Sequence, residues 1–330
     1  MMSFFYNTNS KSNVILKSND KTGDYIMNIF ENASRFIYRN ARPIDLARFK
    51  YHFENETKEE VMNTLSVYQN DDGGFGSALE ADSFNPDSSP IQTWTATEII
   101  KEIDFTDSSH PVIQNILRYL DSEKDFDAGQ NQWLNVVESN NHYPCAVWWK
   151  YGENGSDFKY NPTAALAGFA IKYADSNSRL YHKCCEIARQ AYDWFVSNES
   201  AREMHILNCF IRLYEYCVDA EVQLFDMDAF KTILSQQISS LICKNAERWE
   251  SDYCPRPSDF IKSKSSPFYA DNVEHIKKEC DFIKQNQLSD GSFRVLWQWY
   301  NDYTEFVLAE NWWKSELIIK YLLFLKAFYK

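Results

Sequence analysis

Glycine and proline are scarce in this sequence. Only nine of each occur among 330 residues, and no stretch rich in glycine, serine or proline divides the chain. Because flexible linkers between domains are built from such residues, their absence favours a single domain over residues 1–330. Residues 1–22 are polar, and we expect them to form a poorly ordered or peripheral segment.

Positive charge and long apolar runs are also lacking. The formal net charge is −13, which excludes the basic surface that nonspecific binding of nucleic acid requires. No apolar run reaches the roughly 20 residues of a membrane-spanning helix, and the start of the sequence lacks the apolar core of a signal peptide. We therefore predict no transmembrane segment, no nucleic-acid partner and a cytoplasmic location.

Cysteine is present, but it is not arranged as a disulfide framework. The eight cysteines are scattered, mostly within stretches that have a helical pattern. In a long chain without an export signal, such residues are typical of buried free thiols. Nothing in the sequence predicts an oligomeric state.

Strand-like alternation is rare, whereas helical periodicity runs along the chain. Val61, Leu65 and Tyr68 define one face of a helix, and Pro90 suits the first turn of another over 93–103. Similar patterns cover residues 111–120, 162–173, 180–196, 204–218, 228–242, 272–286 and 314–329. The fold is predicted to be all-α, with about 10 to 13 helices. Twelve helices would close in pairs into an (α/α)6 toroid or barrel, which leaves no end repeat exposed.

One short pattern occurs twice. Residues 69–76 read QNDDGGFG and residues 285–293 read QNQLSDGSF. Each follows a helical stretch, so we expect a tight turn after a helix, in which glycine supplies a positive φ. The phenylalanine would pack back between helices, and the glutamine would bond free backbone groups at helix ends.

The first copy of this pattern resembles the repeat motif of the terpenoid cyclase and protein prenyltransferase (squalene cyclase-like) superfamily. The second copy has Phe293 where that superfamily often has tryptophan. Residues 69–90, 142–149, 161–164 and 311–314 resemble an uncharacterised bacterial group of the same superfamily. The resemblance implies an α/α toroid with a central cavity. It does not fix a reaction, because this fold hosts cyclases, transferases and non-catalytic proteins.

The acid motif of the cyclases and the diphosphate-metal motif are incomplete or absent. The Asp-x-Asp-Asp acid of squalene-type cyclases has its nearest counterpart at Asp226 and Asp228, where the last aspartate is missing. We interpret Asp226 as a helix cap. No Asp-Asp-x-x-Asp motif is present, which argues against ionisation-type terpene synthesis, and the hydrolase motif Gly-x-Ser-x-Gly is absent too.

No cofactor is predicted, although zinc remains an alternative. Asp252 and Cys254 have the Asp-x-Cys spacing of the zinc ligands in protein prenyltransferases, and His142 or His275 would be the third ligand. The residues that follow Cys254 are unlike the helix-associated zinc site of those enzymes. His142 and Cys145, three apart, are a second and equally weak indication of a metal.

Three residues are candidates for catalysis. Glu80 and Asp82 follow the first turn in a stretch rich in aspartate, asparagine and serine. On non-helical backbone two such carboxylates can converge on one ligand, or one can raise the pKa of the other; capping and loop hydrogen bonds are the alternative. His142, ahead of Trp148 and Trp149, is the third, as a general acid or base on an aromatic wall, and plain packing is its alternative.

Aromatic residues are abundant, with ten Trp, 20 Tyr and 23 Phe. An excess of aromatics over core needs favours a lined cavity. Between residues 297 and 313 aromatics alternate with carboxylates, which suits a cationic or sugar-like ligand, or a carbocation; packing between helices is the alternative. The candidate substrate-binding residues are Trp94, Trp148, Trp149, Asn161, Trp249, Tyr253, Trp297, Trp299, Trp312 and Trp313.

Charged residues cluster near the N-terminus at Arg35, Arg39, Arg42, Asp45 and Arg48. An arginine cluster can hold a phosphate or a carboxylate. Ion pairs on a solvated face are the interpretation that we favour.

Three functions agree with these observations. The first is a cyclase-like or prenyltransferase-like protein that binds an apolar, isoprenoid-type ligand in an aromatic cavity, with Glu80 or Asp82 as the acid. The second is a carbohydrate-active or sugar-binding protein, since tryptophan platforms and paired carboxylates suit oligosaccharides. The third is a non-catalytic interaction protein that retains the fold. Whether the chain is an enzyme stays open.

Overall fold

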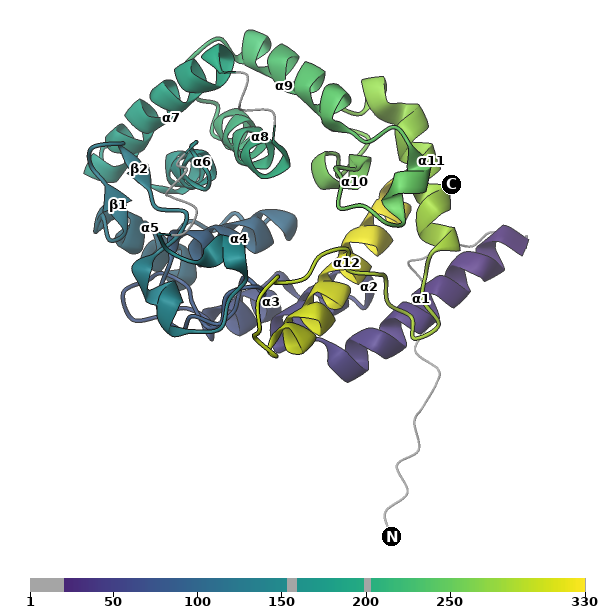
Figure 1. Cartoon of the computed structure of the whole chain (residues 1–330). Coiled ribbons are helices and arrows are strands. Elements are labelled where there is room, and N and C mark those ends of the chain that lie inside the picture. Colours follow the sequence, from purple (N-terminus) through teal and green to yellow (C-terminus); the bar gives the residue numbers. More distant parts are fainter. Residues whose placement is uncertain (1–20, 153–158, 199–202, 330) are drawn as a thin grey trace.

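A computed structural model describes residues 21–152, 159–198 and 203–329 (Figure 1). Residues 1–20 of the expected peripheral segment lie outside this range. The α-helices are α1 (Lys21–Asn40), α2 (Pro43–Phe53), α3 (Lys58–Ser66), α4 (Pro90–Glu102), α5 (Pro111–Asp121), α6 (Thr163–Tyr173), α7 (Arg179–Ser197), α8 (Met204–Asp219), α9 (Met227–Leu241), α10 (Pro257–Phe260), α11 (Val273–Gln285) and α12 (Phe306–Phe328). Short 3-10 helices are η1 (Glu138–His142), η2 (Val147–Trp149), η4 (Ala246–Trp249) and η5 (Ala270–Asn272).

The all-α prediction is confirmed. In the described part of the chain, the strands are β1 (Phe126–Asp127) and β2 (Gln132–Trp133), which form one antiparallel pair. The expected helices agree with the observed ones to within a few residues, except that α12 begins at Phe306 rather than near residue 314. Because α12 begins earlier than expected, Trp312 and Trp313 lie on this helix. No described helix is both long and apolar enough to cross a lipid bilayer.

The helices follow one another around a closed circuit. In Figure 1, α6, α8 and α10 lie nearer the centre of this circuit than α7 and α9. Helix α6 contacts both α4 and α8, α10 contacts α8 and α12, and α12 contacts α1 and α2. The last helix thus packs on α1 and α2, the first two helices of the described chain. The (α/α)6 arrangement stays a prediction that these contacts support.

The first repeated pattern folds as the expected turn. Gly73 has a φ of +96°, and Asp72 accepts a hydrogen bond from the backbone N–H of Gly74 at 3.0 Å. Phe75 is fully buried. The Gln69 amide donates to the carbonyl oxygen of Gly73 at 2.9 Å and to that of a residue at the start of α5 at 3.0 Å. The glutamine therefore fastens the turn to the next helix.

The second pattern reproduces these contacts where the segment after α11 meets α1. Gly291 has a φ of +93°, and Asp290 accepts from the N–H of Ser292 at 2.9 Å. The equivalent glutamine is Gln287, which donates to Gly291 and, at 2.9 Å, to the carbonyl oxygen of Ile29 in α1. The first turn is therefore hydrogen-bonded to α5, and the second is hydrogen-bonded to α1.

Replacing Gly291 with alanine should destabilise the protein by about 2–4 kcal/mol, through a disfavoured positive φ and through overpacking. A Cβ atom there would lie 2.1 Å from the backbone carbonyl oxygen of Asn32. Gly152→Ala is the matched control, because its φ is +87° but no atom lies within 4 Å of the added carbon. Urea unfolding of both variants measures the difference. Equal losses of stability would contradict the close contact with α1.

Sequence reasoning about helix caps and cysteines was correct in most cases. Asp226 caps α9 and accepts from the N–H of Ala229 at 2.9 Å, so its interpretation as a cap is confirmed. All eight cysteines are free thiols, and six are buried as expected. Cys243 and Cys254 are only partly buried, and for these two the expectation was wrong. Both lie in the segment between α9 and α10, outside the long helices that carry five of the six buried cysteines.

Candidate functional site

The loop between the first turn and α4 positions Glu80. It is held at both sides by buried polar side chains. The guanidinium of Arg42 donates to the carbonyl oxygens of Ala78 at 2.7 Å and Leu79 at 3.1 Å. The side-chain oxygen of Gln92, at the start of α4, accepts from the N–H of Leu79 at 3.0 Å. Because these contacts fix the backbone just before Glu80, its carboxyl is held in place on an otherwise irregular segment.

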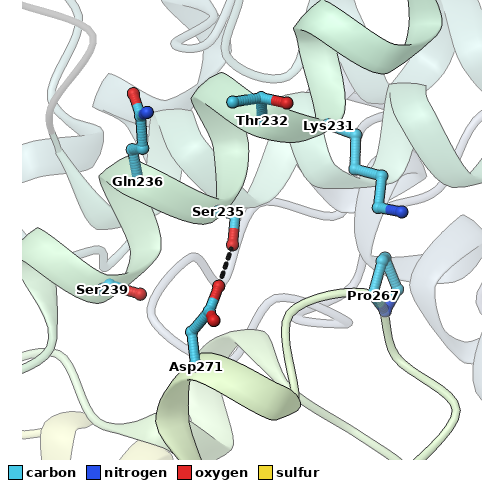
Figure 2. A pocket seen from close by; sticks show the side chains of 7 residues that line it. All are labelled: Lys231, Thr232, Ser235, Gln236, Ser239, Pro267 and Asp271. Carbon is cyan, nitrogen blue, oxygen red and sulfur yellow. Dashed lines mark hydrogen bonds between the residues drawn. The ribbon is translucent and has the colours of Figure 1, made fainter.

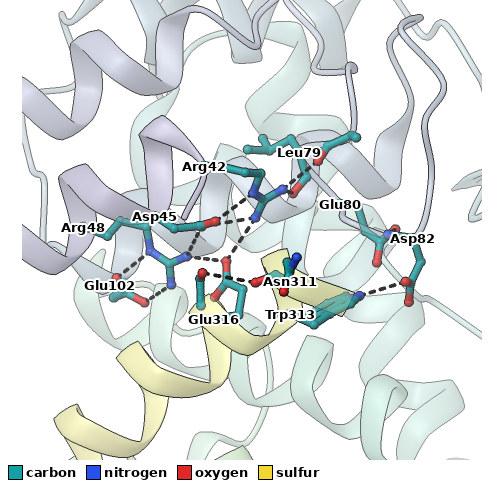
Figure 3. A network of polar contacts seen from close by, with 12 residues as sticks. Arg42, Asp45, Arg48, Leu79, Glu80, Asp82, Glu102, Asn311, Trp313 and Glu316 are labelled. Atoms are coloured by element: carbon teal, nitrogen blue, oxygen red, sulfur yellow. Dashed lines mark hydrogen bonds and ion pairs between the residues drawn. The ribbon is translucent and has the colours of Figure 1, made fainter. Parts of the chain in front are cut away.

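Asp82 binds three tryptophan side chains at once. Its carboxylate accepts from the indole N–H of Trp299 at 2.6 Å, of Trp313 at 2.8 Å and of Trp297 at 3.2 Å. Asp82 is 3% exposed. Figure 3 shows the Trp313 ring of α12 pointing at this carboxylate. Asp82 therefore joins segments more than two hundred residues apart in the sequence.

Further aromatic rings extend this cluster into a wall. The rings of Phe84 and Trp312 are stacked with centroids 5.1 Å apart, and the Arg42 guanidinium lies 5.4 Å from the centroid of Trp312. Trp148 and Trp149, from η2, pack on the same small cluster as Trp299. The structure thus brings together most of the predicted aromatic residues. We call the set Trp148, Trp149, Trp297, Trp312 and Trp313, which are all partly exposed, the tryptophan wall.

The environment favours the protonated form of Glu80. Burial and then the nearby charge of Asp82 raise the pKa of Glu80 well above its usual value of 4.5, although Trp149 and Arg42 act in the opposite direction. Burial also raises the pKa of Asp82, against the three indole donors. Glu80 nevertheless retains some exposure to solvent. A raised pKa together with access from outside suits a general acid.

A second group of titratable residues meets the same wall. The imidazole of His205 lies 2.6 Å from the Glu203 carboxylate through Nδ1 and 3.1 Å from the Tyr253 hydroxyl through Nε2. The Tyr253 ring meets Trp297 edge-on, with centroids 5.2 Å apart. Burial opposes the pairing of His205 with Glu203, yet the pair raises the pKa of His205 and lowers that of Glu203 to about 2. The carboxylate of Glu203 is therefore ionised near neutral pH, and it favours the charged form of His205.

Tyr253 and Lys262 are exposed groups whose pKa values are nevertheless shifted by desolvation. Tyr253 is 52% exposed, and its pKa is raised, first by desolvation and then by carboxylates that include Asp259, Glu203, Asp82 and Glu80. Lys262 is likewise exposed, and desolvation lowers its pKa to about 8. Tyr253 therefore lies within electrostatic reach of both carboxylates of the Glu80 loop.

A buried ion network lies behind the Glu80 loop (Figure 3). Arg42 pairs with Asp45 at 2.8 Å, and Arg48 pairs with Glu102 of α4 at 2.6 Å. Both arginines also contact Glu316 of α12. Arg42, Asp45 and Arg48 are buried, so the solvated face that we expected for them was wrong, because α4 and α12 cover this side of α2. Only the two arginines on α1, at positions 35 and 39, are exposed.

Four predicted residues lie apart from this arrangement. His142 is exposed at the end of η1, and the indole of Trp94 donates to Glu98 of its own helix at 3.0 Å. Trp249 is 1% exposed and donates to a backbone carbonyl, while the side-chain oxygen of Asn161 lies 3.5 Å from the sulfur of Cys209. We therefore leave these four out of the proposed site.

The zinc alternative finds no support in the arrangement of side chains. Within residues 21–152, 159–198 and 203–329, no three side chains of His, Cys, Asp or Glu come together as metal ligands would. Asp252 instead pairs with Arg248 at 2.7 Å. This ion pair lowers the pKa of Asp252 and occupies the carboxylate.

Two cavities lie away from the carboxylates. One of about 560 Å³ is bounded by α9 and the segment before η5 (Figure 2), where Ser235 donates to Asp271 at 3.0 Å. The other, of about 400 Å³, lies between α1 and the second turn. Neither is lined by Glu80, Asp82 or the tryptophan wall. We therefore place the candidate site by its chemistry rather than by the size of a hollow.

Sequence reasoning missed several residues of the site. Glu203 and His205 stand two residues apart at the start of α8, where the glutamate caps the helix. That short pattern was the available signal, but it is also typical of ordinary helix caps. Arg42 was noted only as a member of the charged cluster and Phe84 gave no signal, because their roles here depend on contacts with Leu79 and Trp312.

Comparisons of the chain with protein-family models, with curated proteins and with solved structures found no match. Function is therefore inferred from the chemistry of the site.

Proposed function

We propose that the protein binds a polyhydroxylated, sugar-like ligand on the tryptophan wall and that Glu80 acts on it as a general acid. The supporting observation is the partly accessible carboxyl of Glu80 beside this wall, whose pKa burial and the charge of Asp82 raise. Tryptophan rings bind the apolar faces of sugar rings, and a carboxyl whose pKa is raised by such an environment suits protonation of a glycosidic oxygen.

The same observation favours a sugar-like over an isoprenoid substrate. A carboxyl with a raised pKa is a weak acid, so it transfers its proton more readily to an oxygen lone pair than to an alkene. Charged groups also lie near Trp297, namely the pair of Glu203 and His205, which Tyr253 connects to that ring. An apolar ligand would desolvate these charges without compensation, whereas hydroxyl groups can hydrogen-bond to them.

The two carboxylates have different roles in this proposal. Three indole N–H groups occupy the oxygen atoms of Asp82, so Asp82 is a positioning residue that orients the wall. Glu80, whose carboxyl accepts a hydrogen bond from the N–H of Asp82 at 3.0 Å, is the acid. Tyr253 and His205 lie on the far side of Trp297 and would hold ligand hydroxyls there.

An apolar, isoprenoid-type ligand is the second candidate. It is favoured by the resemblance of the repeated turn to squalene cyclase-like proteins and by the number of rings around Asp82. Aromatic faces also stabilise carbocations. In this case Glu80 would still be the acid, and the charged pair of Glu203 and His205 would lie outside the ligand's reach.

A ligand screen separates the two candidates. Thermal shift and tryptophan fluorescence are measured with neutral oligosaccharides, isoprenoid diphosphates and a squalene-like lipid. A ligand at one hundred times its dissociation constant adds about 2.7 kcal/mol to the stability. We expect a thermal shift with oligosaccharides. Tyr253→Phe should weaken their affinity at least tenfold, because it removes a hydroxyl beside Trp297.

The control for this screen is Tyr300→Phe, which changes an exposed tyrosine that follows the wall segment. A shift only with the isoprenoid compounds would favour the second candidate. No response to any compound, in a protein that unfolds cooperatively, would contradict both and favour a non-catalytic interaction protein.

A further inference from the structure

Two cysteines near Tyr253 lie side by side. Cys243, just after α9, donates its backbone N–H to the carbonyl oxygen of Pro255 at 2.8 Å. This contact brings the segment around Cys243 next to the segment around Cys254, where burial and the nearby thiol of Cys243 raise the pKa of Cys254. The indole of Trp249, buried within the intervening loop, donates to the carbonyl oxygen of Cys243 at 2.9 Å. The loop between the two cysteines is therefore anchored with its two ends together.

These two thiols also differ from the other cysteines in access. Cys243 and Cys254 are partly exposed, whereas the remaining six cysteines are buried. A small-molecule disulfide can therefore reach these two sulfur atoms, whereas buried thiols are inert.

We propose that Cys243 and Cys254 form a reversible intramolecular disulfide by exchange with a small-molecule disulfide. The thiolate of Cys243 attacks one sulfur of that disulfide, which breaks the S–S bond, releases one small thiolate and leaves a mixed disulfide on Cys243. Cys254 then attacks this mixed disulfide and releases the second small thiolate. Two protein thiols are oxidised, one small disulfide is reduced to two thiols, and their two protons pass to the released thiolates.

We assign the second step to Cys254 because its thiol is not readily ionised. Burial and the contact with Cys243 raise the pKa of Cys254 to about 12. In the second step the mixed disulfide is held next to Cys254, so a small thiolate fraction is offset by proximity. The reaction is independent of the proposed ligand, since it requires only the two thiols and an oxidant.

Oxidation should change the surroundings of Tyr253 and Trp297. Tyr253 directly precedes Cys254 and contacts both His205 and Trp297. A disulfide fixes its two sulfur atoms about 2.05 Å apart and limits the distance between the two backbones that it joins. Forming the bond therefore restrains the backbone beside Tyr253, and we expect a change in tryptophan fluorescence on oxidation.

The test uses the full-length wild-type protein with oxidised glutathione as the oxidant. After incubation, free thiols are alkylated under native conditions and the peptides are mapped by mass spectrometry. We expect one peptide pair linked through Cys243 and Cys254, unalkylated at both positions, and full recovery of both thiols after dithiothreitol. Cys243→Ser and Cys254→Ser should each accumulate a glutathione adduct on the remaining cysteine instead of a crosslink.

A matched control is Cys280→Ala, which removes a buried thiol and should leave the crosslink intact. The proposal is overturned if both thiols of the wild type are alkylated after treatment, or if they stay as separate glutathione adducts. A crosslink to any other cysteine would overturn it as well. All these outcomes are read from the wild-type chain, so they do not depend on whether a variant folds.

Discussion

Asp82→Ala is expected to lower the free energy of unfolding by about 3–5 kcal/mol, because each buried donor left without an acceptor costs about 1–3 kcal/mol. The substitution removes the acceptor of Trp297, Trp299 and Trp313 together. Trp299 is 1% exposed and cannot turn to water, whereas the other two rings can be partly rehydrated. Equilibrium unfolding in urea, followed by tryptophan fluorescence, measures the loss.

A graded series makes this expectation specific. Asp82→Asn retains one side-chain oxygen but places an amide N–H₂ against an indole donor, so we expect a smaller loss of about 1–3 kcal/mol. Asp71→Ala is the control, since Asp71 is an exposed carboxylate in the first turn and its loss should cost less than about 0.5 kcal/mol. If Asp82→Ala unfolds at the same urea concentration as Asp71→Ala, then Asp82 does not hold the tryptophan wall.

Glu80→Gln is expected to remove general acid catalysis, which contributes about 10²–10⁴-fold to a rate. The amide has nearly the same shape as the carboxyl but has no acidic proton to give, so ligand affinity should change little while turnover falls. The measurement is kcat on whichever oligosaccharide responds in the ligand screen. Asp87→Asn, an exposed carboxylate of the same loop, is the control. Full turnover by Glu80→Gln would exclude Glu80 as the acid, even if the ligand binds.

The stability of the same variant depends on pH with a predictable sign. The pKa of Glu80 is raised above 4.5 on folding, mainly by burial, so the folded state binds more protons than the unfolded state between these two pKa values. Wild-type stability from this group is complete below pH 4.5 and is lost as the pH rises through the folded pKa. Glu80→Gln cannot titrate. It should therefore gain stability relative to wild type as the pH rises, and a constant difference would contradict the pKa shift.

Local features of this protein were predictable from the sequence. The helices follow from their 3.6-residue periodicity, and Pro90 and Asp226 mark helix starts, as the structure confirms. The turn at Gly73 was also predictable, because a positive φ next to an aspartate and a buried phenylalanine depends on neighbouring residues only. Even the equivalence of the two turns was visible, although the matching glutamine is Gln287 rather than Gln285.

The candidate site was predictable only in part. Glu80 and Asp82 could be selected because carboxylates on an irregular loop after a turn are a general functional signal. Their different roles could not be predicted, since they depend on three indoles that reach Asp82 from residues 297, 299 and 313. The burial of Arg42, which fixes the loop from the other side, likewise depends on α12 covering α2.

The sequence by itself therefore determined the helices, their caps and the repeated turn, because these depend on backbone preferences and on side chains within a few residues of each other. The tertiary structure alone decided which carboxyl has a raised pKa, which tryptophans are exposed and which two cysteines lie side by side. A pKa depends on desolvation and on charges brought close in space, and an indole's partner depends on how distant helices pack. Asp82 meets its indole partners only when α12 and the segment before it pack against the first part of the chain.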